Sequence, residues 1–411
     1  MSKVRSKVIV RYIKVGDLRI GKEEKDAVNE VLDSGRISEG KKVREFERRW
    51  AEFIGTKYCI ATSSGAGSLI CLLTALKYSK NLKNGAKVIT TPLTYIADSS
   101  AISVTGFEPV FVDIDPVTFC ISPEAIEAHL KQAKDPENYA IILPVDLMGY
   151  SAKIDKINEI AKKYNLSVLE DAAQAHGTIY KNKKSGSDSD AGIFSFYIAH
   201  NIQSGEMGAV VTNNAEINRL VRKIKAQGRA CNCSVCSRDK GICSLMQNYK
   251  GSDDFDPRFT HELIGYNFKT MEFQAALALV QLKKIDEIIA RRLQNIKYLN
   301  MHLQRYEDIL QLPVYSEETS YLAYPIVIKN NKMISRKILR INLENLGIET
   351  RPMFGCIPTQ QPAYDYLKEK YVRKLPNAEY IGKNGFYIGC HQYLTEEDLK
   401  YIVNVFKKIL E

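Results

Sequence analysis

Four short segments of the chain carry the residue types and spacings that best suit ligand chemistry. The first, 62–69 (TSSGAGSL), places small residues just before an apolar run of helical period. Backbone amides at the start of such a helix lack intrahelical partners and lie at the positive end of its dipole, so they bind phosphate. A plain turn before a helix is the alternative.

The second and third segments follow predicted strands. In 93–102 (LTYIADSSAI), Tyr95 offers an aromatic face to a flat ring, or it packs against the strand end. In 168–177 (VLEDAAQAHG), Asp171 ends a strand at the edge where ligands bind in parallel sheets. Its carboxylate can hold a protonated ring nitrogen and keep that ring an electron sink, while Gln174 can bond a ring hydroxyl. A helix N-cap is the alternative role for Asp171.

The fourth segment, 192–212 (GIFSFYIAHNIQSGEMGAVVT), has the pattern of a strand, a polar loop with glycines and a second strand. Ser195 can reach a phosphate from the first of these strands, and His200 projects from the loop. Imidazole transfers protons near neutral pH, which makes His200 a candidate acid or base. A loop histidine with no chemical role is the alternative.

Apolar runs of strand length alternate with helical patterns through the first half of the chain. Strands that are apolar on both faces and joined by helices indicate a mostly parallel sheet covered on both sides. One long helical stretch after Met271 leads to a small lobe. We therefore predict an α/β fold with a large cofactor-binding domain at 1–285 and a small C-terminal α+β domain at 286–411. The strands of the large sheet are expected at 87–90, 109–113, 140–145, 167–171, 193–197 and 209–212.

Charge and hydropathy exclude several classes of protein. The chain has 58 Lys and Arg against 48 Asp and Glu, a net charge of +10, and these charges are interleaved with apolar residues. This distribution favours a solvated surface over a nucleic-acid patch. No apolar run has the length of a membrane span, and the start lacks a signal-peptide core. We expect a cytoplasmic protein with neither a membrane nor a nucleic-acid partner.

A long loop is predicted at 228–258, and it contains a cluster of cysteines. Four thiols within so few positions are costly to leave idle, because exposed thiols oxidise readily. An iron–sulfur cluster, a structural zinc ion and free thiols are the open interpretations, although the spacing differs from the usual zinc-knuckle pattern. The four residues are Cys231, Cys233, Cys236 and Cys243.

Taken together, these segments resemble the DegT/DnrJ/EryC1/StrS family of sugar aminotransferases. The resemblance begins at SGRISEGKKVREFERRWAEFIGTKYCIATSSG, continues through VLEDAAQAHG and IGYNFKTMEFQAALALVQL, and ends at LPNAEYIGKNGFYIGCHQYLTEEDL. It covers nearly the whole chain in one order. It implies the type I pyridoxal-phosphate fold, which is aspartate aminotransferase-like, with pyridoxal phosphate or pyridoxamine phosphate as the cofactor.

The resemblance also implies roles for the matching residues. The backbone at Ala66 and Gly67, together with the Ser195 hydroxyl, is expected to hold the cofactor phosphate. Tyr95 is expected to stack on the cofactor ring.

Two further residues complete the implied cofactor site. Asp171 is expected to pair with the ring nitrogen and Gln174 with the ring oxygen. Asn267, in GYN, resembles the asparagine that reaches the phosphate from the neighbouring subunit, which implies a homodimer with shared active sites. Arg351, in TRPMF, is a candidate to meet an anionic part of the substrate, or else a structural arginine at a strand end.

One position departs from most of the family. The family's loop reads S-F-x-x-x-K, whereas Ser195 and Phe196 are followed here, at the same spacing, by His200. No lysine lies between Lys184 and Lys223. A lysine amine forms a Schiff base with the cofactor aldehyde, and imidazole cannot. The cofactor is therefore expected to be held without a covalent bond.

The segment SFYIAHNI is similar to the pattern of one subgroup, the 3-dehydratases that make 3,6-dideoxysugar precursors. The resemblance implies that pyridoxamine phosphate condenses with the C4 ketone of a nucleotide-diphosphate 4-keto-6-deoxysugar. His200 then removes a proton from the cofactor methylene carbon as general base, and the C3 hydroxyl leaves as water. An ordinary sugar aminotransferase and a catalytically silent regulator or scaffold are the alternatives.

The subgroup has two branches that differ after the loss of water. One branch releases ammonia, and the other carries an iron–sulfur cluster and takes electrons from a separate reductase. Cys231 and Cys233, with later cysteines upstream of GYN, are similar to the cluster-bearing branch. That branch takes one ligand from the position two after the ring-nitrogen aspartate, where this chain has Ala173. The sequence therefore leaves the electron source open.

Overall fold

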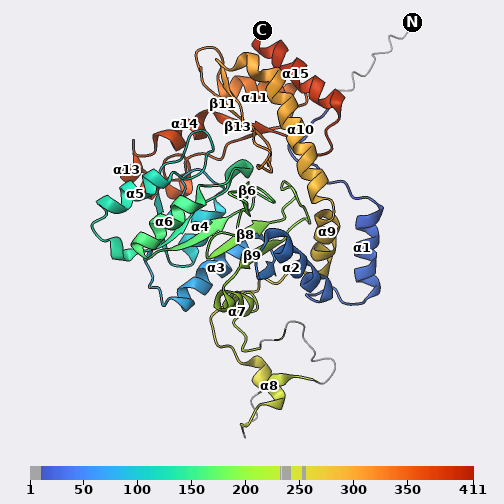
Figure 1. Ribbon diagram of the computed structural model, residues 1–411, viewed down its shortest axis with the longest axis vertical. Helices are drawn as coiled ribbons and strands as arrows, with labels where there is room; N and C mark the ends of the chain where they lie inside the picture. The colour runs from blue at the N-terminus through green and yellow to red at the C-terminus, as the bar shows by residue number, and fades with distance from the viewer. Residues whose placement is uncertain (1–10, 232, 234–241, 252–255) are drawn as a thin grey trace.

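The computed structural model describes residues 11–231, 233, 242–251 and 256–411. Its first 212 residues supply a large sheet of seven strands, in the order β1-β9-β8-β5-β4-β2-β3, and its C-terminal part supplies a second, smaller sheet (Figure 1). The strands of the large sheet are β1 Tyr58–Thr62, β2 Lys87–Thr90, β3 Glu108–Phe111, β4 Tyr139–Leu143, β5 Ser167–Asp171, β8 Ala191–Ser195 and β9 Gly208–Thr212.

The large sheet is mostly parallel, as the sequence predicts. β3, β2, β4, β5 and β8 pair in parallel, and β9 runs antiparallel to both β8 and β1. β1 therefore has the same direction as β8. The strand ends at Thr62, Thr90, Asp171 and Ser195 consequently all lie at one edge of the sheet, which we call the carboxyl edge.

Both faces of this sheet are buried, which explains why its strands read as continuous apolar runs. Ile193 and Val210 pack in the core that also holds α3 and α6, whereas their neighbours Phe194 and Ala209 pack with Trp50 of α2 on the other face. The helices of this part are α1 Lys22–Asp33, α2 Lys41–Ile54, α3 Gly65–Ser79, α4 Ala97–Val104, α5 Pro123–Gln132, α6 Ile154–Tyr164 and α7 Ala215–Ile224. A short hairpin, β6 Ile179–Tyr180 and β7 Lys183–Lys184, stands apart from the sheet.

The smaller sheet is antiparallel, with the strand order β10-β11-β13-β12. The predicted α+β character of the C-terminal part is therefore correct, and the exact boundary at 285/286 stays a prediction. Its elements are α10 Ile285–Leu303, β10 Leu310–Gln311, β11 Tyr324–Ile328, α11 Arg336–Asn345, β12 Thr350–Pro352, α12 Ile357–Gln360, α13 Lys368–Tyr371, α14 Pro376–Asn384, β13 Gly385–Ile388 and α15 Glu396–Leu410.

The single long helix expected after Met271 is wrong. The chain forms α9 (Glu272–Leu282) and then α10, with a break at Lys283 and Lys284. At the break, Lys284 leaves helical geometry and its ammonium pairs with the carboxylates of Glu23 and Glu24 on α1. α9 thereby packs between α1 and α2, while α10 runs on toward α15 and the smaller sheet (Figure 1).

The predicted loop at 228–258 contains some helix in its described parts. A short helix, α8 (Ser244–Gln247), lies well away from the large sheet, beyond α7 (Figure 1). A 3-10 turn follows at Pro257–Phe259. Of the helices in the described ranges, none combines the length and the apolar character that a bilayer span requires.

Gly208, the first residue of β9, sits so close to α3 that it has no room for a side chain. A Cβ built there would lie 2.2 Å from the carbonyl oxygen of Ser64 and 2.6 Å from Ser68 Oγ. We predict that Gly208→Ala pushes the start of α3 outward and lowers the free energy of unfolding by about 1–3 kcal/mol.

Urea unfolding followed by circular dichroism measures this cost. Gly16→Ala is the matched control, since a Cβ there meets only Ala199 and Ile198 atoms at 3.4 Å or more. Equal stability of the two variants would contradict the predicted contact.

Candidate active site at the carboxyl edge

Small residues at the start of α3 bring the Ser195 hydroxyl to the first turn of that helix. A Cβ on Gly65 would lie only 2.7 Å from Ser195 Cβ and 3.2 Å from Ser195 Oγ, so only glycine permits this approach. First-turn amides have no intrahelical acceptor. The segment and the serine thus lie together in a candidate cradle for an anion.

Within this cradle, the amide of Gly67 is already used. Its N–H donates to Ser64 Oγ at 3.0 Å, because Ser64 caps the helix. Ala66 is exposed at the first turn. Ala66 remains available together with Ser195, and Gly65 makes the close approach to that serine. The expected phosphate contacts of Ala66, Gly67 and Ser195 stay predictions.

Tyr95 lies in the loop between β2 and α4 at the same edge. Its side chain is 61% exposed, and its ring meets Phe354 edge-on at a centroid distance of 6.1 Å. A face of the ring is therefore open to a flat partner, as the stacking prediction requires. Its role stays a prediction.

Asp171 ends β5 and is 7% exposed. No helix follows it, so the alternative role as an N-cap is wrong. Its Oδ1 accepts the Ala173 N–H at 2.8 Å, and its side chain also hydrogen-bonds to Asp98. Burial raises the pKa of Asp171, while the bonds from Asp98 and Ala173 oppose that rise.

Gln174 is oriented by a backbone donor. Its Oε1 accepts the Met148 N–H at 2.9 Å, and since an N–H only donates, the amide oxygen must face Met148. The Nε2 group then keeps two hydrogens for another acceptor. This is the arrangement that a bond to a ring oxygen needs.

His200 is held in one tautomer by the backbone. Its Nδ1 lies 2.7 Å from the carbonyl oxygen of Ser195, which can only accept, so Nδ1 carries the hydrogen. In the neutral ring, Nε2 is then a free lone pair. The loop that carries it is fixed further, since the His200 amide donates to Tyr197 O and Gln203 Nε2 donates to His200 O.

The surroundings of His200 keep its ring neutral. Burial is the main cause that lowers the pKa of His200 to about 4, although the bond to Ser195 O opposes it. Its ring centroid lies 5.8 Å from that of His176, a fully buried histidine whose pKa burial lowers far below the usual value. At neutral pH, the His200 ring is therefore uncharged, and its role as a base stays a prediction.

The lysines that flank this loop in sequence are engaged elsewhere. Lys184 Nζ donates to the carbonyl oxygen of Phe53 at 2.5 Å and lies over the Phe53 ring. Lys223 is buried and pairs with Glu262. Neither the Lys184 nor the Lys223 amine is therefore free to take the place of the family's lysine at residue 200.

Two predicted residues make their polar contacts away from the other predicted site residues in the part of the chain that the structure describes. Asn267 is exposed on its own chain, where its Oδ1 accepts from Lys269 Nζ at 2.9 Å, although its neighbour Phe268 covers Gly67. Arg351, on β12, pairs with Glu349 at 3.1 Å. The roles of Asn267 toward a phosphate and of Arg351 toward a substrate stay predictions.

The cysteine cluster finds no support as a metal site. Cys233 N–H donates to Cys231 Sγ at 3.3 Å, and Cys231, Cys233 and Cys243 are free thiols. Across the described ranges, no group of three or more His, Cys, Asp or Glu residues is arranged to hold a metal ion. Cys236 lies outside the described residues.

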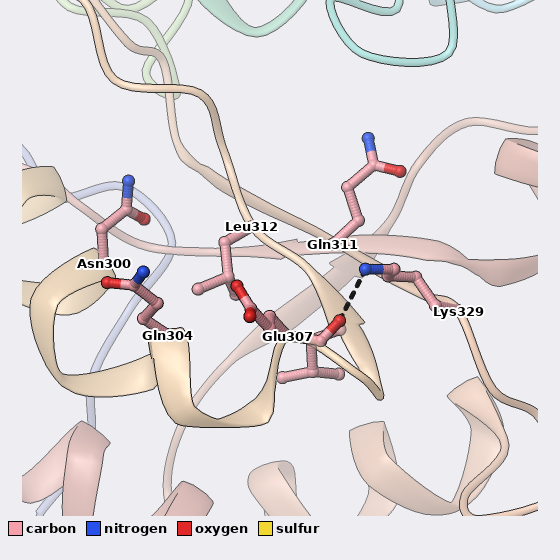
Figure 2. Close-up of a pocket in the computed structure, with 7 residues that line it drawn as sticks. Asn300, Gln304, Glu307, Gln311, Leu312 and Lys329 are labelled. Carbon is pink, nitrogen blue, oxygen red and sulfur yellow. Dashed lines mark hydrogen bonds between the residues drawn. The ribbon is translucent and has the colours of Figure 1, made fainter.

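The surface also has a pocket outside the carboxyl edge. It has a volume of about 290 Å³ and lies where α10 meets β10 and β11 (Figure 2). Lys329 Nζ donates to the Glu307 carbonyl oxygen at 2.6 Å on its wall. Its lining is mostly amide and charged side chains, and none of the predicted site residues belongs to it.

Three residues of the site were missed from the sequence. Gly65 and Asp98 lie inside segments singled out for Ala66 and Tyr95, and His176 lies two residues after Gln174. An acid within LTYIADSSAI was a visible signal for Asp98. Its significance depends on the approach of α4 to β5, which no local pattern shows.

The fold and the carboxyl edge together define an α/β protein whose candidate ligand site lies where parallel strands end. A model of the DegT/DnrJ/EryC1/StrS aminotransferase family matches residues 18–407. The chain belongs to this family, and the resemblance inferred from its motifs is confirmed.

Similar proteins include both dehydratases and aminotransferases. The chain is 31% identical to the GDP-4-keto-6-deoxy-D-mannose 3-dehydratase of Escherichia coli O55:H7 over 93% of this chain and 96% of that protein. An E. coli GDP-4-keto-6-deoxy-D-mannose-3-dehydratase structure with bound hydrated PLP superposes with a TM-score of 0.84 and 28% identity, covering 98% of this chain and all of that one. Helicobacter pylori PseC, an aminotransferase of pseudoaminic acid biosynthesis, gives a TM-score of 0.84 at 26% identity, covering 97% and 99%. The predicted fold class is confirmed.

The lowered pKa of His200 predicts a pH-dependent stability. The unfolded chain protonates this imidazole near pH 6.5, whereas the folded protein resists protonation until about pH 4. Wild type should therefore lose about 1–3 kcal/mol of unfolding free energy relative to His200→Asn as the pH falls from 7 to 4. Above pH 6.5 the difference between the two proteins should be constant.

Urea titrations of both proteins at several pH values measure this difference. Subtracting the two curves removes the contributions of the buried acids, which are common to both. Parallel curves from pH 7 to pH 4 would show that His200 is not kept neutral by the fold.

Proposed function

We propose that this protein is a pyridoxamine-phosphate-dependent 3-dehydratase of a nucleotide-linked 4-keto-6-deoxysugar. The observation that carries the proposal is the hydrogen bond from His200 Nδ1 to Ser195 O. That bond leaves a neutral, basic Nε2 at the position where most of the family has a lysine. Such a group moves a proton, but it cannot hold the cofactor covalently.

The residues at the carboxyl edge fit the cofactor. Its phosphate would lie on Ala66 and Ser195, where the space left by Gly65 opens the helix start. Its ring would lie on Tyr95, with the ring nitrogen at Asp171 and the ring oxygen at the free Nε2 of Gln174. When bound, pyridoxamine phosphate supplies an amine for the sugar C4 ketone and a ring that accepts electrons.

The protein's own groups then perform three tasks. Asp171, as a carboxylate, holds a proton on the ring nitrogen. His200 Nε2 would take a proton from the carbon that carries the amine and deliver it to the C3 hydroxyl, which would leave as water. Gln174 fixes the orientation of the ring by donating to its oxygen.

We further propose a homodimer in which Asn267 serves the partner's site. Asn267 is exposed on its own chain, and its backbone bridges to Ala226, just after α7. Its exposure suits a residue that acts across an interface. Isologous contact between two copies would then complete two identical sites.

Relatives support the substrate class. The E. coli 3-dehydratase acts on a GDP-linked 4-keto-6-deoxysugar, and its structure binds PLP. We therefore expect a nucleotide-diphosphate 4-keto-6-deoxyhexose as substrate, in the biosynthesis of deoxysugars for surface polysaccharides.

An amino transfer is the second candidate function. The likeness to PseC favours it, because that aminotransferase covers nearly the whole chain at the same TM-score. The two candidates differ in product: one loses water from C3, and the other gains an amino group at C4.

Incubation with pyridoxamine phosphate and a panel of nucleotide 4-keto-6-deoxysugars separates them. Mass spectrometry should show the loss of water from one member of the panel. An amino sugar formed with glutamate, without the loss of water, would replace the dehydratase proposal by the aminotransferase. No binding of pyridoxamine phosphate at all would leave a silent scaffold or regulator as the better interpretation.

Substitution of His200 should remove the chemistry and spare the binding. We predict that His200→Asn lowers the rate of water loss by about 10²–10⁴-fold, the usual contribution of a general base, while pyridoxamine phosphate still binds. His129→Asn, in a histidine on α5 that bonds Tyr139, is the matched control and should keep the wild-type rate.

His200→Lys should restore an amine at the loop and change the absorption band of added pyridoxal phosphate. If His200→Asn dehydrated the substrate at the wild-type rate, the assignment of His200 as the base would be wrong.

A further inference from the structure

A second buried carboxyl group lies against Asp171. Asp98, in the first turn of α4, is 1% exposed, and its Oδ2 accepts the Thr94 hydroxyl at 2.7 Å. Its Oδ1 is buried and receives no N–H or O–H from the surrounding residues, yet the Asp98 side chain hydrogen-bonds to Asp171. Ionised carboxylates only accept, so this contact requires a proton between the two groups.

The surroundings determine which group holds that proton. Burial, followed by the charge of Asp171, raises the pKa of Asp98 far above its usual value. For Asp171 the bonds from Asp98 and from the Ala173 N–H counter the effect of burial. The proton therefore resides on Asp98, and Asp171 is the anion.

The other acids near the pair reinforce this assignment. Asp146 feels the charge of Asp171 and has its pKa raised, mainly by burial, to about 6. Glu170, buried beside Asp146, has its pKa raised by burial and by that neighbour. A second negative charge on Asp98 would thus add to an acidic, desolvated region, which is unfavourable.

We propose that Asp98 is a positioning residue that, as a neutral acid donating to Asp171, keeps Asp171 ionised for the ring nitrogen of the cofactor. The inference rests on the proposed function, since it gives Asp171 the ring-nitrogen role. Asp98 does not contact the ring; it acts through Asp171. The charge of Asp171 then remains available to hold the ring N–H.

The contact between Asp98 and Asp171 should set the pH dependence of cofactor binding. Binding of pyridoxamine phosphate needs the Asp171 carboxylate, so the affinity falls as the pH drops through the pKa of Asp171. The bond from Asp98 limits the rise of that pKa caused by burial and so extends binding to lower pH. Without the bond, the acid limit of binding should move to higher pH.

The test measures the affinity of the full-length, cofactor-free protein for pyridoxamine phosphate from pH 5 to pH 8, by calorimetry. In Asp98→Ala the acid limit should rise by one pH unit or more, which weakens binding about tenfold at the acid end. Asp98→Asn should restore the wild-type limit, because its amide still donates to Asp171. Ser99→Ala, at the adjacent buried residue of α4, is the matched control and should leave the limit unchanged.

Each outcome bears on the inference. The same acid limit in Asp98→Ala as in wild type would overturn it, as would equal loss of affinity at every pH. If Asp98→Asn behaved like Asp98→Ala, the donor role would be overturned. If wild type bound no pyridoxamine phosphate at any pH, the proposed function itself would fail, and this inference with it.

A second measurement does not depend on the folding of Asp98→Ala. The infrared spectrum of cofactor-free wild type at pH 7 should contain a protonated-carboxyl band that is missing in Asp98→Asn. Identical spectra in the carboxyl region would show that Asp98 is ionised and would overturn the proposal.

Discussion

The pairing of β5 with β8 is the constraint on which the site depends. The two strands are parallel neighbours, with Asp171 opposite Ile193, so Ser195 follows just beyond the end of β5. The same strand end supplies the carbonyl oxygen that fixes the His200 ring. The residues proposed for a ring nitrogen, for a phosphate and as base are therefore positioned by one strand register. A shift of β8 by one residue along β5 would turn Ser195 to the other face and move the carbonyl oxygen that fixes His200.

A buried edge with this many ionisable groups is stable only if few of them carry charge. Burial disfavours the charged form of every group there, so it lowers the pKa values of the histidines and raises those of the acids. His176 and His200 have lowered pKa values, and Asp98 and Glu170 have strongly raised ones. The pKa of Asp171 is raised by burial too, but the backbone and Asp98 both donate to it and oppose that rise. The charge that remains is thus placed where a cationic ring nitrogen would neutralise it.

Much of this arrangement was predictable because the relevant signals are local. Apolar runs with polar ends defined β5 and β2 at their observed bounds, and the strand-end rule placed Asp171 at the ligand-binding edge. β8 lies two residues earlier than the strand predicted at 193–197, which puts Ser195 at its end. The break at Lys283 and Lys284 was not predictable, since the apolar period continues across it and the cause is a contact with α1. The tautomer of His200 also escaped prediction, because it depends on the backbone path of the loop rather than on residue types. The role of Asp98 also could not be predicted from local sequence. Asp98 follows β2, whereas its partner Asp171 ends β5, which is two strands away in the sheet.

The replacement of an amine by an imidazole alters more than one bond at this edge. A lysine amine at residue 200 would bring a positive charge next to the buried His176. It would also anchor the cofactor ring through a covalent bond. Under the proposed function, the cofactor ring is held by non-covalent contacts alone, which places greater demand on Asp171, Gln174 and the start of α3. The close approach of Gly65 to Ser195, the backbone bond that orients Gln174 and the acid behind Asp171 each fix one of those contacts in advance. Preorganisation of this kind lowers the entropy lost on binding, and it substitutes for the missing covalent bond.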